Sequence, residues 1–230
     1  SPRVAAAPPF ARVLGEMFGS DPRAAAIALP TRPLHLMYAE PARRFIEGRG
    51  GRVMTGVTVK LHVAPDGRID ARAGGERWTA PAIVSAVPWF ALPDLFDEPP
   101  AALADTFARA RATGASPIVT VNLWFDREVM DEPFIGLPGR RMQWIFDKRA
   151  VFGEADHAAS HVSMVSSGAA EGLRLENQEL IADAHDELLA SLPAGRAAQL
   201  TRAAVSREPQ ATFALAPGQP ARPSTATALR

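Results

Sequence analysis

One stretch of the sequence decides the fold: SPIVTVNLWFDREV, residues 116–129. Its residues alternate with a period of two, which is typical of a strand that packs one face into a core. One face would carry Val119, Val121, Leu123 and Phe125, and the other Ile118, Thr120, Asn122 and Trp124. The stretch therefore predicts a strand over residues 117–126, with one core face and one mixed face.

Further elements are predicted downstream of this strand. Short strands are expected around residues 142–146, 161–166, 203–206 and 212–214. The best helical pattern covers residues 177–192, where Leu180, Ile181, Ala184, Leu188 and Leu189 recur at helical spacing and Pro193 ends the run. Together these patterns predict a sheet with a helix packed against it.

The chain upstream predicts helices and a small meander. Helices are expected at residues 10–18, at 34–48 with a break near Pro41, and at 101–111. Alternation in residues 57–63 and again in 69–73, across the turn residues Pro65, Asp66 and Gly67, predicts a hairpin. A third strand should follow Gly75. The apolar run at residues 82–87 predicts a strand buried on both faces within a sheet.

Composition excludes several classes of function. The 230 residues are 47% hydrophobic, enough for one sizeable core or two modest ones, and contain 25 basic and 25 acidic residues. This balance argues against nucleic-acid binding. The absence of cysteine excludes disulfides and thiolate chemistry and fits a cytoplasmic location. No apolar stretch approaches the length of a transmembrane segment, so we expect any membrane contact to be peripheral.

Histidine and serine residues suggest chemistry only weakly. His157 and His161, with Asp156 beside them, could share a helix face and bind a metal, but no helix or third ligand is evident, so surface positions are preferred. No Gly-x-Ser-x-Gly turn surrounds Ser166 and Ser167, which argues against a hydrolase.

Two aspartates near strand ends have a structural interpretation. Asp126 and Asp147 each follow an aromatic residue, and we expect them to cap turns rather than to act as acids in a pocket.

Four segments together resemble the flavin-containing amine oxidase and phytoene desaturase superfamily, and most closely its hydroxysqualene dehydroxylase branch. They are, in order, PARRFIEGRGGRVMTGVTVKLHV at 41–63, APAIVSAVP at 80–88, SPIVTVNLWFDREV with MQWIFDK at 116–129 and 142–148, and SREPQATFALAPGQPARPSTATALR at 206–230. The resemblance covers most of the chain.

The resemblance implies roles for particular residues. Val59 would contact the adenine of FAD through its backbone, and Ala86 and Pro88 would lie beside the flavin. The wall of a pocket for a long hydrocarbon would be formed by Trp124, Met142 and Trp144, with Phe146 as a further candidate, because apolar substrates are bound by aromatic and methionine side chains. Ordinary core packing is the alternative for each of them.

The resemblance also implies a fold and a domain organisation. We expect an α+β protein with a mixed, largely antiparallel sheet, helices on one side, and a small β-meander. Residues 1–44 and 89–210 would form a discontinuous substrate-binding domain, and residues 45–88 the meander of the FAD-binding domain. Residues 211–230 would be extended or disordered. Exposed apolar surface would promote self-association.

The activity implied is that of an FAD-dependent oxidoreductase acting on an apolar isoprenoid, with reductive conversion of hydroxysqualene to squalene for hopanoids as the leading choice. A carotenoid or phytoene-type desaturase, an amine oxidase, and a non-catalytic module for an apolar ligand or a protein are the alternatives. The chain has no Gly-x-Gly-x-x-Gly turn and no Ala-Gly-Asp motif for the flavin, so we expect it to be an internal part of the enzyme that binds FAD weakly or not at all. Its catalytic residues are not identified.

Overall fold

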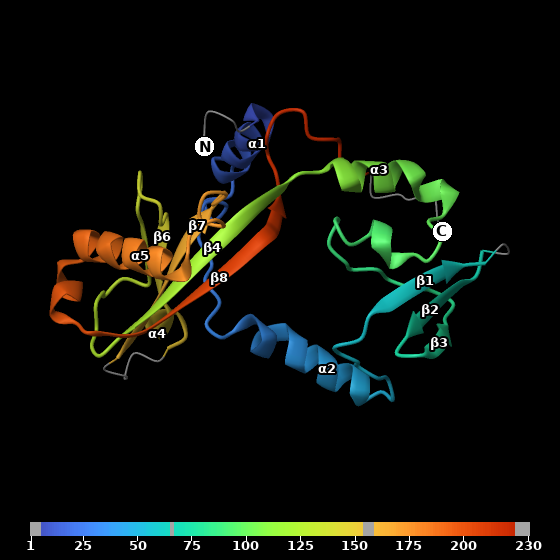
Figure 1. The fold of residues 1–230 in the computed structure, drawn as a ribbon, viewed down its shortest axis with the longest axis horizontal. Helices are drawn as coiled ribbons and strands as arrows, with labels where there is room; N and C mark the ends of the chain where they lie inside the picture. Colours follow the sequence, from blue (N-terminus) through green and yellow to red (C-terminus); the bar gives the residue numbers. More distant parts are fainter. Residues whose placement is uncertain (1–5, 65–66, 154–158, 224–230) are drawn as a thin grey trace. The chain divides into compact units, whose positions relative to one another are not determined.

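A computed structural model describes residues 6–64, 67–153 and 159–223 (Figure 1). The chain divides into two compact units, one made of Ser1–Phe45 and Ala115–Leu215, and the other of Ile46–Gly114 and Ala216–Arg230. Each unit combines helices with an antiparallel sheet. The predicted α+β class is therefore confirmed.

The first unit is built on a five-stranded sheet. Its strands lie in the order β5-β6-β7-β4-β8, and every neighbouring pair is antiparallel. Their bounds are Phe134–Gly136 for β5, Trp144–Asp147 for β6, Ser160–Ser167 for β7, Ala115–Phe125 for β4 and Leu200–Phe213 for β8. The strand predicted at residues 117–126 thus lies inside the sheet, between β7 and β8.

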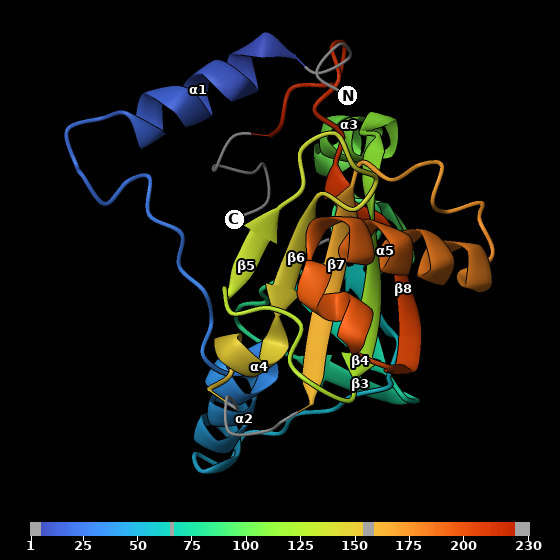
Figure 2. The same ribbon diagram turned by 90° about the vertical axis from the view of Figure 1, so that its left-hand side faces the viewer.

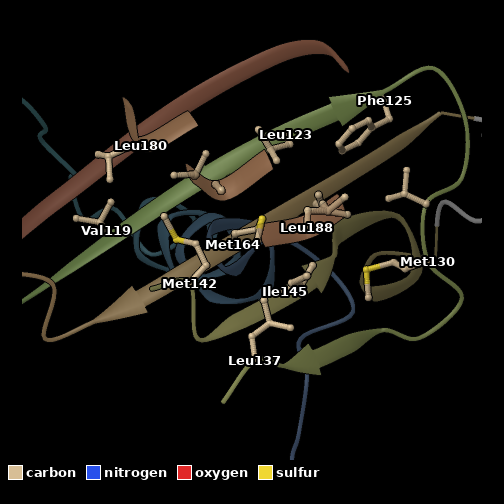
Figure 3. Packing of buried hydrophobic residues seen from close by; sticks show 14 residues of the cluster. Val119, Leu123, Phe125, Met130, Leu137, Met142, Ile145, Met164, Leu180 and Leu188 are labelled. Carbon is tan, nitrogen blue, oxygen red and sulfur yellow. The ribbon is translucent and has the colours of Figure 1, made fainter. Parts of the chain in front are cut away.

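Helix α5 (Asn177–Ser191) covers one face of this sheet, as Figure 2 shows. Its first turn is held by a capping box, in which the side chains of Glu176 and Glu179 satisfy backbone N–H groups. The core lies between helix and sheet (Figure 3). Its fully buried members include Val121, Leu123 and Phe125 of β4, Val162 and Met164 of β7, Ile145 of β6, and Leu180, Ala184 and Leu188 of α5.

Strand β8 differs from the prediction of two short strands, since it is one strand of 14 residues. Its register against β4 shifts between Ser116 and Ile118, where Ser116 faces Thr212 and Ile118 faces Glu208. Pro117 lies in this irregularity on β4, and Pro209 lies in it on β8. Because proline has no N–H to donate, two prolines that share one bulge interrupt the hydrogen-bond ladder only once.

The N-terminal helices of the first unit leave large apolar side chains exposed. Helix α1 (Ala7–Met17) has no buried residue, and Phe10 on it is 63% exposed. The predicted break near Pro41 is a change of helix type, because a π-helical turn, η2 (His35–Ala39), runs into helix α2 (Glu40–Glu47). Pro41 therefore lies inside a continuous helical run, directly after the π-helical turn.

The second unit contains the predicted meander. Strands β1 (Val59–Val63), β2 (Ile69–Ala73) and β3 (Glu76–Thr79) pair antiparallel in sequence order. A segment with two short 3-10 turns, η3 (Pro93–Leu95) and η4 (Ala101–Leu103), and helix α3 (Ala104–Ala112) packs against them. Its Phe96, Leu103 and Phe107 form one buried cluster with Leu61 of β1. Residues 89–114 therefore fold with the meander, whereas the sequence grouped them with the substrate-binding part.

The predicted buried strand at residues 82–87 is wrong. These residues have no regular secondary structure, and Val84 is 91% exposed. Prolines on both sides limit the backbone, and no strand of the described residues pairs with the segment. An apolar segment is buried only where another surface packs against it, so apolar composition alone does not establish a buried strand.

The C-terminal region continues β8 and then leaves regular structure. Residues 211–213 belong to β8, and residues 214–223 contain no helix or strand. Residues 224–230 of the predicted tail lie outside the described residues. No helix within the described ranges has the length and apolar character that crossing a membrane requires.

Candidate functional site

The face of the five-stranded sheet opposite α5 carries aromatic and polar side chains from all its strands. Strand alternation places Trp124 and Asn122 of β4 on this face, because their neighbours Val121, Leu123 and Phe125 point into the core. Cross-strand register then adds the partners on the other strands. We call this surface the open face; its main residues are Phe134, Trp144, Phe146, His161, Ser163, Asn122, Trp124 and Arg202.

Trp124 is held between side chains of both neighbouring strands. Its indole stacks on the imidazole of His161 on β7, with ring centroids 4.2 Å apart and planes at 16°. Arg202 on β8 places its guanidinium carbon 4.6 Å from the centroid of the same indole. Because β7 and β8 flank β4 on opposite sides, both faces of the indole are covered, and only its edge can meet a ligand.

Asn122 is the centre of a polar cluster on the same face. Its Oδ1 accepts a hydrogen bond from the hydroxyl of Ser163, and Nε2 of His161 lies 3.0 Å from the same oxygen. With Oδ1 as acceptor, Nε2 of His161 carries the hydrogen. Ser163 is 3% exposed, so this cluster is embedded in the surface of the sheet rather than displayed on its rim.

A group of three aromatic rings lies on the other half of the open face. Phe134, Trp144 and Phe146 from β5 and β6 have ring centroids 6.1 to 6.4 Å apart. Trp144 lies over Gly136, where an added Cβ would be 3.4 Å from Cζ3 of the indole. Trp144 is 39% exposed, and it is therefore the ring most accessible to an apolar ligand.

Met142 does not share this face with the two tryptophans. It is fully buried in the core beneath α5, and its backbone N–H donates to Glu187 of that helix at 2.8 Å. It also borders a hollow of about 320 Å³ at the end of the sheet, whose lining includes Arg140, Ser166 and Gly172. The sequence grouped Met142 in one wall with Trp124, Trp144 and Phe146, and the structure brings the three aromatic residues, but not Met142, to one face.

The three residues with a predicted cofactor role lie in the second unit. Val59 begins β1, pairs with Ala73 and is 40% exposed. Ala86 and Pro88 are exposed and lie in the segment without regular structure that follows the meander. The carbonyl of Pro88 accepts hydrogen bonds from the backbone N–H groups of Ala91 and Leu92, which start a tight turn.

The aspartates at the strand ends are structural, as expected. Oδ1 of Asp126 accepts the backbone N–H of Gln199 at 2.8 Å, and Arg127 pairs with its carboxylate. Both contacts lower the pKa of Asp126, with the hydrogen bond from Arg127 the larger cause. Asp147 caps the short helix α4 (Lys148–Val151) by accepting the N–H of Arg149.

A buried cation, the guanidinium of Arg149, lies beside the cap formed by Asp147. Arg149 is 7% exposed and pairs with Glu128 and with the fully buried Asp147. The hydrogen bond from Arg149 lowers the pKa of Glu128. A charge buried within a protein is stable only when it is paired, and the two carboxylates pair with Arg149 here. The cluster therefore has a structural role. It links the loop after β4 to the end of β6.

The hypothesis of a metal site at His157 and His161 gains no further ligand among the described residues. His157 and Asp156 lie outside them, while His161 is a strand residue engaged with Asn122 and Trp124. Within the described parts of the chain, no group of three side chains suited to a metal is found. Sequence reasoning missed Ser163, Arg202 and Phe134, because only the pairing register shows that they face the open side.

Comparisons with known proteins were made with both sequence and structure. No family model and no curated protein matches the sequence. Solved structures do match. An oxidoreductase from Methanosarcina mazei gives a TM-score of 0.59 at 18% identity over 80% of this chain and 44% of that protein. A putrescine oxidase variant gives 0.59 at 16% identity, covering 74% of this chain and 38% of the oxidase.

A third match is a putative protoporphyrinogen oxidase from Exiguobacterium sp. 255-15, with a TM-score of 0.52 and 13% identity over 69% of this chain and 35% of that protein. The chain thus spans less than half the length of these three structures. At such identities the likeness establishes a shared fold. All three are described as oxidases or oxidoreductases, in agreement with the class of fold that the sequence motifs indicate.

Proposed function

We propose that this chain forms the substrate-binding part of an FAD-dependent oxidoreductase that acts on a long polyisoprenoid, with hydroxysqualene as the substrate and squalene as the product. The observation that carries the proposal is the open face, where exposed aromatic rings adjoin one small polar cluster. Such a surface suits a ligand that is apolar over most of its length. The fold shared with three oxidases and oxidoreductases supports the reaction class.

The aromatic group supplies the apolar wall of the proposed site. Phe134, Trp144 and Phe146 are held close together by the pairing of β5 with β6, so a ligand meets a preformed surface. Burial of apolar area is worth about 25 cal/mol per Å², and a long hydrocarbon gains most from a continuous surface. Charged residues are few on this half of the face, in keeping with a substrate that carries no charge.

The flavin would be bound mainly by parts of a longer polypeptide. In the second unit, Val59 offers an apolar neighbour for an adenine ring, and Ala86 and Pro88 offer small side chains beside an isoalloxazine. The described residues contain no Gly-x-Gly-x-x-Gly turn between a strand and a helix, which is the element that holds the pyrophosphate. FAD, when bound, would supply hydride transfer, and the chain's residues would orient the substrate and exclude water.

This proposal assigns different tasks to the two units. The first unit, with the open face, would bind the substrate, and the second unit would belong to the flavin side. Residues 89–114 would then support the meander, since Phe96 and Phe107 pack on Leu61.

Turnover of defined substrates tests the reaction. The full-length protein that contains this chain is incubated with hydroxysqualene in its reduced form, and in its oxidised form it is incubated separately with phytoene and with a diamine. Squalene detected by mass spectrometry only from hydroxysqualene is the expected result. A desaturated carotenoid or an aldehyde would instead identify the desaturase or the amine oxidase, and no product from any substrate would favour a non-catalytic module.

A further inference from the structure

We propose that Asn122 determines specificity by donating a hydrogen bond to a single oxygen at one end of an otherwise apolar ligand. This inference rests on the proposed function, because it assumes that the open face binds such a ligand. It adds the chemical feature that sets the ligand's position, namely an uncharged acceptor oxygen such as that of a hydroxyl.

The Asn122 carboxamide has its oxygen directed at two polar neighbours. The hydroxyl of Ser163 and Nε2 of His161 both lie within hydrogen-bond distance of Oδ1. Both groups therefore contact the amide oxygen, and neither contacts Nδ2. His161 is in turn stacked on Trp124.

The consequence is that Nδ2 of Asn122 carries two hydrogens with no hydrogen-bond partner among the described residues. Asn122 is half-buried, so in the free protein water satisfies these donors. An apolar ligand laid over the cluster would displace that water. Leaving a buried donor unsatisfied costs about 1–3 kcal/mol, so a ligand that offers an oxygen at this point is favoured over one that does not.

The position of the cluster also orients the rest of the ligand. Strand β7 lies between β4, which carries Asn122, and β6, which carries Trp144, so the two residues are about two strand spacings, or roughly 10 Å, apart across the sheet. Val165 lies between these strands, opposite Trp144. On the β8 side, Ala204 lies opposite Asn122 and offers little apolar surface compared with the aromatic group on β5 and β6. A ligand with its oxygen at Asn122 would therefore extend its apolar body toward Trp144.

Two probes of equal length isolate this effect. Farnesal and farnesene share a fifteen-carbon isoprenoid skeleton, and only farnesal carries an oxygen, which accepts hydrogen bonds and cannot donate them. Their dissociation constants for the 230-residue chain are measured by equilibrium dialysis. We expect farnesal to bind about tenfold more tightly, which corresponds to one hydrogen bond.

Asn122→Asp is the decisive variant. Aspartate has the same shape and still accepts from Ser163 and His161, but it cannot donate to the ligand. The preference for farnesal should fall to about onefold while farnesene still binds. Asn177→Asp is the matched control, because it makes the same chemical change at the start of α5, where Asn177 accepts from Arg207. It should keep the tenfold preference.

The outcomes separate this inference from the proposed function. Equal binding of both probes to the unmodified chain, or a preference that survives Asn122→Asp, would overturn the role of Asn122 and leave the apolar site in place. Binding of neither probe would overturn both. If circular dichroism shows that Asn122→Asp is unfolded, Ser163→Ala tests the same point. It removes one of the two donors that orient the amide and should reduce the preference at least threefold, whereas an unchanged preference would refute the inference.

Discussion

Trp124 and His161 face each other across β4 and β7, and their rings stack with centroids 4.2 Å apart. This pair is connected to the polar cluster, because His161 also contacts Asn122. The stack therefore contributes to stability as well as to the geometry of the polar cluster.

Removal of the stacked ring should weaken the sheet. His161→Ala is expected to lower the free energy of unfolding by about 1–2 kcal/mol, since an aromatic pair contributes about 0.5–1.5 kcal/mol beyond its buried area. Urea unfolding followed by circular dichroism measures the change. His161→Phe keeps a ring over Trp124 and should recover most of the loss. Equal losses in the two variants would show that the hydrogen bond to Asn122, rather than the stack, is responsible.

The packing of α5 on the sheet should dominate the stability of the first unit. Leu188 of α5 is fully buried against the sheet. Leu188→Ala is expected to lower the free energy of unfolding by about 2–5 kcal/mol, because it leaves a cavity. Leu36→Ala makes the same change at a side chain that is 48% exposed and should cost less than about 1 kcal/mol. Urea midpoints of the two variants test the contrast, and similar midpoints would mean that α5 does not pack as described.

The meander should lose stability in acid through Asp70. This carboxylate is 3% exposed and accepts hydrogen bonds from Arg77 and Thr79, which lower its pKa from the ordinary value of 3.8. A carboxyl group with a lowered folded pKa stabilises the protein fully above its unfolded pKa, and this contribution disappears as the pH falls through the folded value. Stability should therefore decline below about pH 4.

Asp70→Asn tests this pH dependence, because asparagine cannot titrate. Thermal unfolding between pH 2 and pH 6 should show a flatter profile in the variant than in the unmodified chain. Glu98→Gln, at an exposed position in the same unit, is the control and should keep the original profile. A decline in Asp70→Asn as steep as that of the unmodified chain would assign the acid sensitivity to other groups.

The exposed apolar side chains of α1 should promote self-association. Phe10 is 63% exposed, and Phe18, which follows the helix, is 79% exposed. We expect light scattering to show oligomers at micromolar concentration, and the double variant Phe10→Ser with Phe18→Ser to reduce them. Glu16→Ser, on the same helix, should leave them unchanged. A monomeric profile of the unmodified chain would contradict this expectation.

The 230-residue chain should bind FAD weakly or not at all. The described residues contain no turn to hold the pyrophosphate, so titration with FAD should give no saturable quenching of flavin fluorescence. Dissociation in the micromolar range would mean that another surface holds the cofactor. Val59→Asp would then show whether the meander is involved, since an added carboxylate there would weaken binding.

Much of the fold could be predicted because its signals are local. The alternation around Leu123 predicted β4, the helical spacing of Leu180, Ala184 and Leu188 predicted α5, and the residues on either side of Gly67 predicted the hairpin of β1 and β2. In each case one buried face leaves a repeat in the sequence. The two tryptophans of the proposed site were also found, since their strands were recognised.

The sequence by itself determined which segments become strands or helices and which of their faces are apolar, because that information lies in the spacing of neighbouring residues. Tertiary structure alone decided that Trp124 lies between His161 and Arg202, and that Asn122 accepts from Ser163. It also placed Met142 in the core rather than beside Trp144. These outcomes depend on strand order and register, which bring together residues about 40 to 80 positions apart and which no local spacing encodes.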